Sequence, residues 1–375
     1  MTAANDPARP LWAEIDTGAL AHNLGVVREL AGPRRLIASV KANGYGHGAV
    51  PMAKALTALG VDTLWTGSIA EALAIRAAGI ATRILMFGGY LPADIPALLR
   101  NGLTPTIYDR AGAEAASAAT NGPAAVYVKV DAGLGRLGIP LPDAEALIAE
   151  IADLPNLVIE GIYSHLPFSD AAGRERARER YEAFATLLQR LADRGIRPPV
   201  TQVWASSGLL AAMPDVCNAV CVGHLLYGLS PGDAEISHGV ALRPIMTTIK
   251  TRLIHVAHRA AGRDNASGGA YATRNARITG VVPLGLGDGM RKPAPGQTIS
   301  LIVGGRRAPV IGVSLEHTTL DLTDIDGAQV GDDAILVGHS NGLDTDFKDL
   351  ARWFACGELE AVMTFSGRLA TDLSA

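Results

Sequence analysis

The chain has 375 residues, a formal net charge of −4 and a hydrophobic share of 48%. This length exceeds one typical folding core and is enough for two domains. Because only 19% of the residues are charged and the balance is slightly acidic, no basic footprint for nucleic acid is present. We therefore expect no nucleic-acid partner.

The apolar runs and the cysteines indicate in which cellular compartment the protein is expected. No apolar run approaches the ~20 residues that a membrane helix needs, so we expect no membrane partner. The stretch from Met1 to Pro10 holds no apolar core segment, and we expect no secretory signal peptide. Cys217, Cys221 and Cys356 are odd in number and lack the spacing of a metal site. These features favour a cytoplasmic protein without a metal or a disulfide framework.

The first two-thirds of the chain alternate short apolar runs with helix-length amphipathic segments. The candidate strands are Leu36–Val40, Thr63–Gly67, Arg83–Phe87, Leu103–Ile107, Ala124–Val130, Leu157–Tyr163, Thr201–Ala205 and Ala219–Val222. The candidate helices include Ala49–Leu59, Ile69–Ala78, Asp143–Ala152 and Arg174–Arg194. This alternation predicts an α/β fold in which a parallel sheet closes into a (β/α)8 TIM barrel. An open doubly wound sheet is the alternative, and the number of strands favours the barrel.

After about residue 240 the pattern changes to β-type runs separated by Gly and Asp. The runs are Met246–Ala257, Ala276–Pro283, Thr298–Val303, Ala308–Val313, Thr318–Leu322 and Ala334–Val337. Such a series is typical of an antiparallel sheet. We expect a barrel domain over residues 11–240, followed by a mostly antiparallel C-terminal β-domain over residues 241–375.

Lys41 directly follows the first expected strand, in the segment V-K-A-N-G-Y-G-H-G that also holds Tyr45 and His47. In a barrel of this kind, functional groups gather at the carboxyl ends of the strands. A lysine there points into the barrel mouth, where loss of hydration lowers the pKa of its amine and makes it nucleophilic. A lysine that reaches past the strand end into solvent is the commoner alternative.

Other expected strand ends carry matching polar groups. In chain order they are Lys129, Arg136, His165, Ser207 and Gly223–His224. A hydroxyl and backbone amides on the last two strands lie where barrels commonly bind phosphate. Together these residues predict a lysine, a phosphate site and a carboxylate-binding arginine at one mouth.

Several of these segments resemble the alanine racemase family. They are the Lys41 segment, the Gly-Arg-Leu-Gly around Arg136, Ser164-His165, Leu226-Tyr227-Gly228, the Pro283–Gly289 segment and Arg368. The resemblance runs from about Leu11 to Leu373. It implies an enzyme that uses pyridoxal 5'-phosphate (PLP), of fold-type III, acting as a racemase or epimerase on a small-molecule amino-acid substrate.

The resemblance also implies residue roles. Lys41 would hold PLP as an internal aldimine and act as the base on one face of the substrate Cα. The implied cofactor-binding residues are Lys41, Tyr45, Arg136, His165, Ser207, Cys221, Gly223 and His224. Arg136 and Leu315 would contact the substrate. Lys129 matches a lysine that is carbamylated in some relatives. The second domain of one subunit would complete the pocket of the other, which implies a head-to-tail homodimer with shared active sites.

The sequence departs from the family at its opposite-face base. The position of the family's catalytic tyrosine falls on Gly268, or on Ser267 if the alignment slips by one residue. Racemisation needs a second acid on that face. Tyr271, His317 or a water molecule are the candidate replacements.

Further departures surround the expected pocket. The family arginine that faces the pyridine nitrogen is replaced by Cys221, for which buried packing is the alternative role. Two entrance tyrosines fall on Leu286 and Leu359, and a Met-Asp pair reads Leu315-Glu316. Loss of the tyrosine rim should widen the pocket, so the substrate is expected to be bulkier than alanine.

Three functions follow from this pattern. The first is amino-acid racemisation or epimerisation with PLP at Lys41. The second keeps PLP but uses only one face of Cα, as in retro-aldol cleavage, elimination or transfer at Cα, because Lys41 is then the sole base. The third is a non-catalytic PLP-binding homologue.

Overall fold

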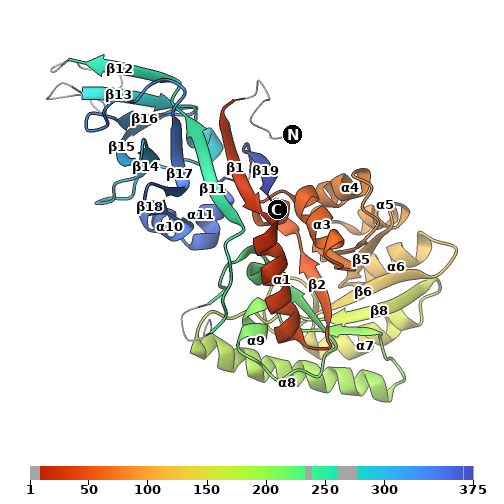
Figure 1. Ribbon diagram of the computed structural model, residues 1–375. Coiled ribbons are helices and arrows are strands. Elements are labelled where there is room, and N and C mark those ends of the chain that lie inside the picture. The colour runs from red at the N-terminus through yellow and green to blue at the C-terminus, as the bar shows by residue number, and fades with distance from the viewer. Residues whose placement is uncertain (1–8, 233–238, 261–276, 366, 375) are drawn as a thin grey trace. The chain divides into compact units, whose positions relative to one another are not determined.

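The computed structural model describes residues 9–232, 239–260, 277–365 and 367–374 (Figure 1). The chain divides into two compact units. One unit comprises Ala19–Gly44 and Ala49–Arg243, and the other comprises residues 9–18, Tyr45–Gly48 and the described residues from 244 onward. Over this described part of the chain, every helix falls short of the length and apolarity that a membrane crossing requires.

The first unit is a closed barrel of parallel strands, which confirms the expected fold class. Its strands are β2 (Arg35–Ser39), β3 (Thr63–Thr66), β4 (Arg83–Met86), β5 (Leu103–Ile107), β6 (Ala124–Asp131), β8 (Leu157–Tyr163), β9 (Val200–Gln202) and β10 (Ala219–Val222). Each pairs with its neighbour in chain order, and β10 pairs with β2, so the sheet closes on itself. A short strand, β7 (Ile139–Pro140), adds to β6.

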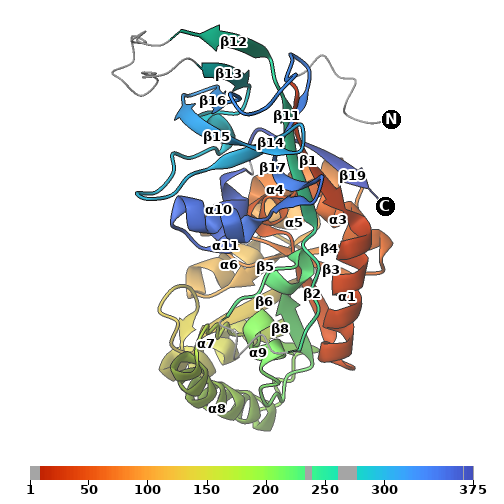
Figure 2. The ribbon, with the colours of Figure 1, turned by 60° about the vertical axis from the view of Figure 1, so that its left-hand side comes forward.

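Helical segments precede, connect and follow the barrel strands, and helices cover the outer face of the sheet (Figures 1 and 2). They are α1 (Thr17–Ala31), α3 (Ala49–Ala58), α4 (Ile69–Ala77), η2 (Pro92–Asp94), α5 (Ile95–Arg100), α6 (Arg110–Ala118), α7 (Leu141–Ala152), α8 (Ala171–Asp193), α9 (Ser206–Leu210) and η3 (His224–Tyr227). Ser68, Asp109 and Asp170 begin α4, α6 and α8, where each side chain accepts a hydrogen bond from a first-turn amide. The segment α2 (Lys41–Tyr45) is not a right-handed helix, since its inner residues have positive φ angles.

The barrel interior is filled by large side chains. The core cluster consists of Ile37, Trp65, Leu85, Tyr127, Tyr163, Val200 and Ala219, with Phe87 and Cys221 packed against it. Room for the Tyr127 ring comes from Gly161, where a Cβ would lie 2.2 Å from the ring atom Cε1. The interior is therefore a packed core below the strand ends, as barrels of this kind require.

The second unit is built on a mostly antiparallel sheet. Its strands are β1 (Leu11–Asp16), β11 (Met246–Arg252), β12 (His255–Arg259), β13 (Arg277–Val282), β14 (Ser300–Val303), β15 (Arg306–Val313), β16 (Thr318–Asp321), β17 (Asp333–Ser340), β18 (Leu343–Thr345) and β19 (Ala370–Ser374). The sheet order is β12-β13-β16-β15-β14-β17-β11-β1-β19, with β18 beside β17. Only the β1–β19 pair is parallel among these described strands. The helical elements are η4 (Leu286–Asp288), α10 (Phe347–Phe354) and α11 (Glu358–Thr364).

Two features of this unit differ from the sequence expectation. The expected barrel domain began at residue 11, whereas β1 lies in the second sheet between β11 and β19. Its alternating buried residues Leu11, Ala13 and Ile15 suit a strand with one buried face. The expected single strand over residues 246–257 is two strands, because the pairing partner changes from β17 to β13 after Arg252.

Helix α10 was not expected in a region dominated by strands. Asp346 begins it by accepting a hydrogen bond from the Asp349 amide at 2.9 Å. Phe347, Leu350 and Phe354 are buried on one side, which is helical spacing. The helix packs against α11 (Figure 2).

Candidate active site

Lys41 lies two residues beyond β2, at the carboxyl end of that strand, and is partly buried. Its Nζ lies 5.8 Å from the centre of the Phe87 ring. Loss of hydration lowers the pKa of the Lys41 amine, with Cys221 opposing this shift and the Arg136 cation adding to it. A lowered pKa leaves more of the amine in the neutral form that attacks a carbonyl. Lys41 therefore lies at the carboxyl end of a barrel strand, with an amine of lowered pKa.

Lys129, near the end of β6, is a second lysine at this mouth. Its side chain is 3% exposed, and its Nζ lies 5.5 Å from the centre of the Tyr163 ring. Burial, followed by repulsion from Arg136, lowers the pKa of Lys129 to about 8. Lys41 lowers the pKa of Lys129 as well, so the two amines lie within electrostatic reach of each other.

Asp131 shapes the loop that carries Arg136. Its Oδ1 accepts hydrogen bonds from the backbone amides of Gly133 (2.8 Å) and Leu134 (2.7 Å), and its Oδ2 accepts one from Gly135 (2.9 Å). These bonds hold the glycine-rich turn directly before the arginine. Arg136 itself is exposed, so its guanidinium is accessible to a ligand.

His165, His224 and Cys221 are uncharged at neutral pH. Burial is the main cause that lowers the pKa of His165 to about 3 and that of His224 to about 4, and Lys41 contributes to both shifts. Cys221 is partly buried, and desolvation raises the pKa of its thiol to about 12. Among the described residues at this mouth, the groups that can carry positive charge are thus the two lysines and Arg136.

The end of β9 supplies two buried hydroxyls at the start of α9. Ser207 Oγ accepts a hydrogen bond from the Phe168 amide at 3.3 Å. Ser206 Oγ is buried and has no hydrogen-bond partner among the described residues. Gly223 and His224 follow β10, which neighbours β9. A buried hydroxyl without a partner is costly unless a ligand or water satisfies it.

The charge balance at the barrel mouth favours an anionic ligand. Lys129 and Arg136 place two cations beside the Lys41 amine, whereas the nearby Asp131 carboxylate is engaged by loop amides. A cleft lined by one sign of charge attracts the opposite sign. A neutral amine beside it suits an aldehyde that carries anionic groups.

Acid should destabilise the barrel through His165. The imidazole pKa is near 6.5 in an unfolded chain and about 3 in the fold, so the unfolded state binds more protons between these values. The free energy of unfolding therefore falls as the pH drops below about 6.5, by about 2 kcal/mol at about pH 5 from this group. Urea unfolding at about pH 7 and about pH 5 measures the loss. Between these two pH values, the free energy of unfolding of His165→Asn should fall by about 2 kcal/mol less than that of the wild type. An equal fall in both proteins would contradict the lowered pKa of His165.

Leu315, the expected substrate contact, lies in the turn between β15 and β16 and is 66% exposed. Leu286, in η4, is 44% exposed. The two turns are joined by hydrogen bonds from the Leu286 amide to Ser314 O and from the Gly287 amide to Leu315 O, both 2.9 Å. The structure therefore brings Leu286 and Leu315 together in the second unit. Leu359 is partly buried in α11.

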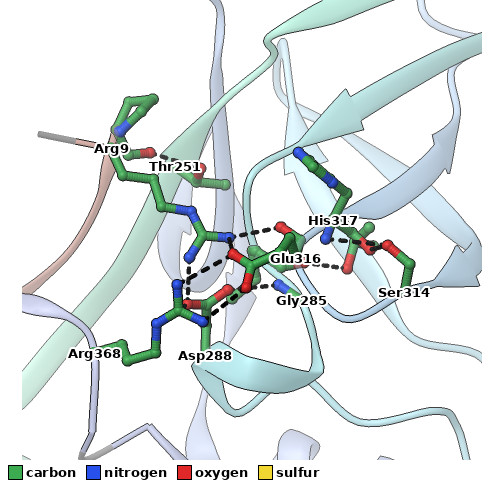
Figure 3. Close-up of polar contacts among 11 residues, drawn as sticks. Arg9, Thr251, Gly285, Asp288, Ser314, Glu316, His317 and Arg368 are labelled. Atoms are coloured by element: carbon green, nitrogen blue, oxygen red, sulfur yellow. Dashed lines mark hydrogen bonds and ion pairs between the residues drawn. The ribbon is translucent and has the colours of Figure 1, made fainter.

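An ion-pair cluster supports these two turns (Figure 3). The Asp288 carboxylate is fully buried and accepts hydrogen bonds from Arg9 Nη1 (2.5 Å) and the Gly285 amide (2.8 Å). Arg368 binds both carboxylate oxygens of Glu316, at 3.0 and 3.1 Å, and these bonds hold the pKa of Glu316 below its usual value. The cluster fixes the positions of the turns that carry the exposed leucines.

Only some of the candidates for an opposite-face base lie among the described residues. Gly268, Ser267 and Tyr271 lie outside the described residues. His317 is exposed, and its backbone is tied to Ser314 by hydrogen bonds at 2.8 to 3.2 Å. This turn belongs to the second unit.

Two residues near Lys41 were missed in the sequence analysis: one contacts its amine and the other binds the segment that follows it. Phe87 follows β4, stacks on Trp65 at 5.5 Å between ring centres and faces the Lys41 amine. Glu71 binds the amide of Asn43 in the segment after Lys41, at 2.7 Å. The Ser-x-x-Glu spacing that ends at Glu71 predicts a helix start, and it carries no sign of the Asn43 contact.

Two family models match the chain. The model described as "Alanine racemase, N-terminal domain" matches residues 15–231, and "Alanine racemase, C-terminal domain" matches residues 246–372. Among curated relatives, the alanine racemase of Desulfovibrio desulfuricans is 33% identical over 335 residues, which is 88% of this chain and 90% of the relative. That of Symbiobacterium thermophilum is 32% identical over 350 residues, or 92% of each chain.

Solved structures agree with these matches. The alanine racemase from Bacillus anthracis with bound L-Ala-P superposes with a TM-score of 0.89 at 25% identity, covering 99% of this chain and 96% of that chain. The alanine racemase from E. faecalis superposes with a TM-score of 0.85 at 29% identity, covering 98% of both chains. The likeness thus spans the barrel and the β-domain.

Proposed function

Since this chain belongs to the alanine racemase family, a family of isomerases, we propose that it is a PLP-dependent amino-acid racemase or epimerase. The observation that carries the proposal is the partly buried Lys41 amine, whose pKa is lowered at the carboxyl end of a barrel strand. Barrel enzymes place their catalytic groups at that end of the strands.

The residues at the barrel mouth fit PLP. Ser206 Oγ is buried without a partner in the described part of the chain, and it offers both a donor and an acceptor beside Ser207. The excess of cations suits the phosphate and the phenolate oxygen of the cofactor. The nucleophilic amine of Lys41 suits its aldehyde.

A defined set of residues would hold the cofactor: Lys41, Tyr45, Arg136, His165, Ser207, Cys221, Gly223 and His224. Tyr45 and Ser207 would bind the phosphate, together with the amides that follow β10. His165 would contact the pyridine ring as a neutral imidazole, which its low pKa supports. Cys221 would face the ring as a neutral thiol, since its pKa is raised.

PLP, when bound, supplies an electron sink for charge that develops at the substrate Cα. The neutral Lys41 amine takes the Cα proton on its own face. The Arg136 guanidinium orients the substrate carboxylate through charge-assisted hydrogen bonds, and the amides that Asp131 binds keep its loop in place. Because His165 and His224 stay neutral, they do not add to the repulsion that lowers the pKa of Lys41.

Racemisation also needs an acid that returns a proton on the opposite face. The family position of this group falls on Gly268, so Tyr271, His317 or a water molecule would take the role. Leu315 would contact the substrate and, with Leu286, would present apolar surface to it. Exposed leucines at both positions support a substrate bulkier than alanine.

The β-domain of one subunit would complete the barrel mouth of a second copy. This arrangement is a head-to-tail homodimer with shared active sites, supported by family membership. We also infer a cytoplasmic location, because Cys217, Cys221 and Cys356 are all free thiols.

Hydrogen exchange at the substrate Cα tests the reaction. The protein loaded with PLP is incubated with each L-amino acid in D₂O, and Cα is followed by NMR. Deuterium incorporation with inversion is the expected result. The absence of exchange with every amino acid would contradict the proposal and favour a PLP-binding role without catalysis.

A second function is favoured by the glycine at residue 268. Lys41 would then act alone, as in retro-aldol cleavage, elimination or transfer at Cα. In the same experiment this reading predicts deuterium exchange with retention, or products other than the enantiomer.

A further inference from the structure

The segment that follows Lys41 has an unusual backbone. Ala42, Asn43, Gly44 and Tyr45 have φ angles of 53°, 54°, 59° and 52°, which is one left-handed turn. Residues with a Cβ disfavour this conformation, and runs of it are rare. A turn of this kind persists only where surrounding contacts hold it.

Asn43 receives such contacts on both sides. Its backbone N–H donates to Glu71 Oε1 at 2.7 Å. Its side-chain Oδ1 accepts from the Ala49 amide, at the start of α3, at 2.9 Å. The Gly44 amide closes the turn by donating to Val40 O at 2.9 Å. The Glu71 contact is the charge-assisted one, and hydrogen bonds to charged groups are the stronger kind.

Hydrogen bonds near the start of α4 hold both the carboxylate and the backbone of Glu71. Its Oε2 accepts from Thr66 Oγ at 2.6 Å, at the carboxyl end of β3. Its backbone N–H donates to Ser68 Oγ at 3.3 Å, which begins α4. The Thr66 Oγ in turn accepts from the Ser68 amide at 3.3 Å. The carboxylate thus links the end of β3 to the turn that follows β2.

We propose that Glu71 is a positioning residue for the cofactor lysine: its carboxylate holds the left-handed turn after Lys41 and so fixes the Lys41 amine in the barrel mouth. The role acts through the backbone. Glu71 does not figure among the charges that shift the pKa of Lys41, whereas Cys221 and Arg136 do. This inference rests on the proposed attachment of PLP at Lys41.

Three variants of the full chain test the role. Glu71→Ala removes both carboxylate contacts. Glu71→Gln keeps an oxygen that can accept from the Asn43 amide. Asp109→Ala is the matched control, because it removes the corresponding cap of α6 and leaves the hydrogen bonds of Glu71 in place. Hydrogen–deuterium exchange of the peptide over residues 41–49 is measured in each protein, together with PLP affinity by absorbance titration.

In Glu71→Ala, we expect faster exchange at the turn and a loss of PLP affinity of roughly ten- to a hundredfold, the range for a hydrogen bond to a charged group. Glu71→Gln should stay close to wild type in both measurements. Asp109→Ala should lower the melting temperature without either change. Wild-type exchange and PLP affinity in Glu71→Ala would overturn the proposal, as would equal changes in Asp109→Ala.

Thr66→Val provides a second route if Glu71→Ala does not fold. It removes the hydroxyl that orients the carboxylate, so exchange at residues 41–49 should rise and PLP affinity should fall, each less than in Glu71→Ala. No change in either would overturn the role of Glu71. A wild-type protein that binds no PLP would instead overturn the proposed function, since exchange at the turn is measured without PLP as well.

Discussion

Replacing Lys41 with alanine is expected to abolish retention of PLP and to lower the rate of Cα proton exchange by ~10³-fold or more. The variant loses the amine that would bind the cofactor covalently and the base on one face, and proton transfer alone contributes 10²–10⁴-fold. Absorbance of the dialysed protein and NMR of the substrate Cα measure the two effects.

Lys54→Ala is the matched control for this loss. Lys54 is an exposed lysine on α3 of the same unit, so its removal changes the net charge equally. It should retain PLP and activity. Retention of both by Lys41→Ala would contradict the assignment of Lys41.

The second large effect is expected for Arg136→Gln. Loss of the charged hydrogen bonds to the substrate carboxylate should lower kcat/KM by about ten- to a hundredfold. The Arg136 cation also lowers the pKa of Lys41 and of Lys129. Its removal should therefore raise both pKa values and leave less neutral amine at a given pH.

The pH profile of kcat tests this electrostatic role, because kcat reports the pKa values of the enzyme–substrate complex, in which the substrate would have released the Lys41 amine. Its rising limb should move to higher pH in Arg136→Gln, because deprotonation of Lys41 then needs a more alkaline solution. Arg100→Gln, at the exposed end of α5, is the control and should leave the limb in place. A fall in kcat/KM with an unmoved limb would show that Arg136 acts on the substrate alone.

The barrel could be predicted from the sequence because each of its strands is a short apolar run. Leu36–Val40 and the seven later runs all match observed strands within three residues at each end. Parallel strands buried on both faces read as such runs. The place of β1 in the second sheet was not predicted, since its partners β11 and β19 lie more than 200 residues away in the chain.

The site residues that could be predicted are those whose position follows from the end of a strand alone. Lys41 and His165 follow expected strands and Lys129 lies near the end of one, and the barrel rule brings such residues to one mouth. Lys41 is among the causes that lower the pKa of both Lys129 and His165, so these three groups lie within electrostatic reach of one another. The contact between Glu71 and Asn43 was not predictable, because it depends on positive φ angles at alanine and asparagine that composition does not signal.

In the second unit, too, contacts between distant segments could not be predicted from the sequence. Arg368 was identified with the family segments, but its partners Asp288 and Glu316 and the remote Arg9 join only in the folded sheet (Figure 3). No local pattern links the start of the chain to its end. The parallel pairing of β1 with β19 brings these segments together.

Covalent attachment of PLP at Lys41 is the central claim. Borohydride reduction of the protein incubated with PLP, followed by peptide mass spectrometry, tests it most directly. We expect reduced PLP on the peptide that contains Lys41, and none on the peptides that contain Lys129 or Lys54. A label at another lysine, or no label on any peptide, would contradict the account.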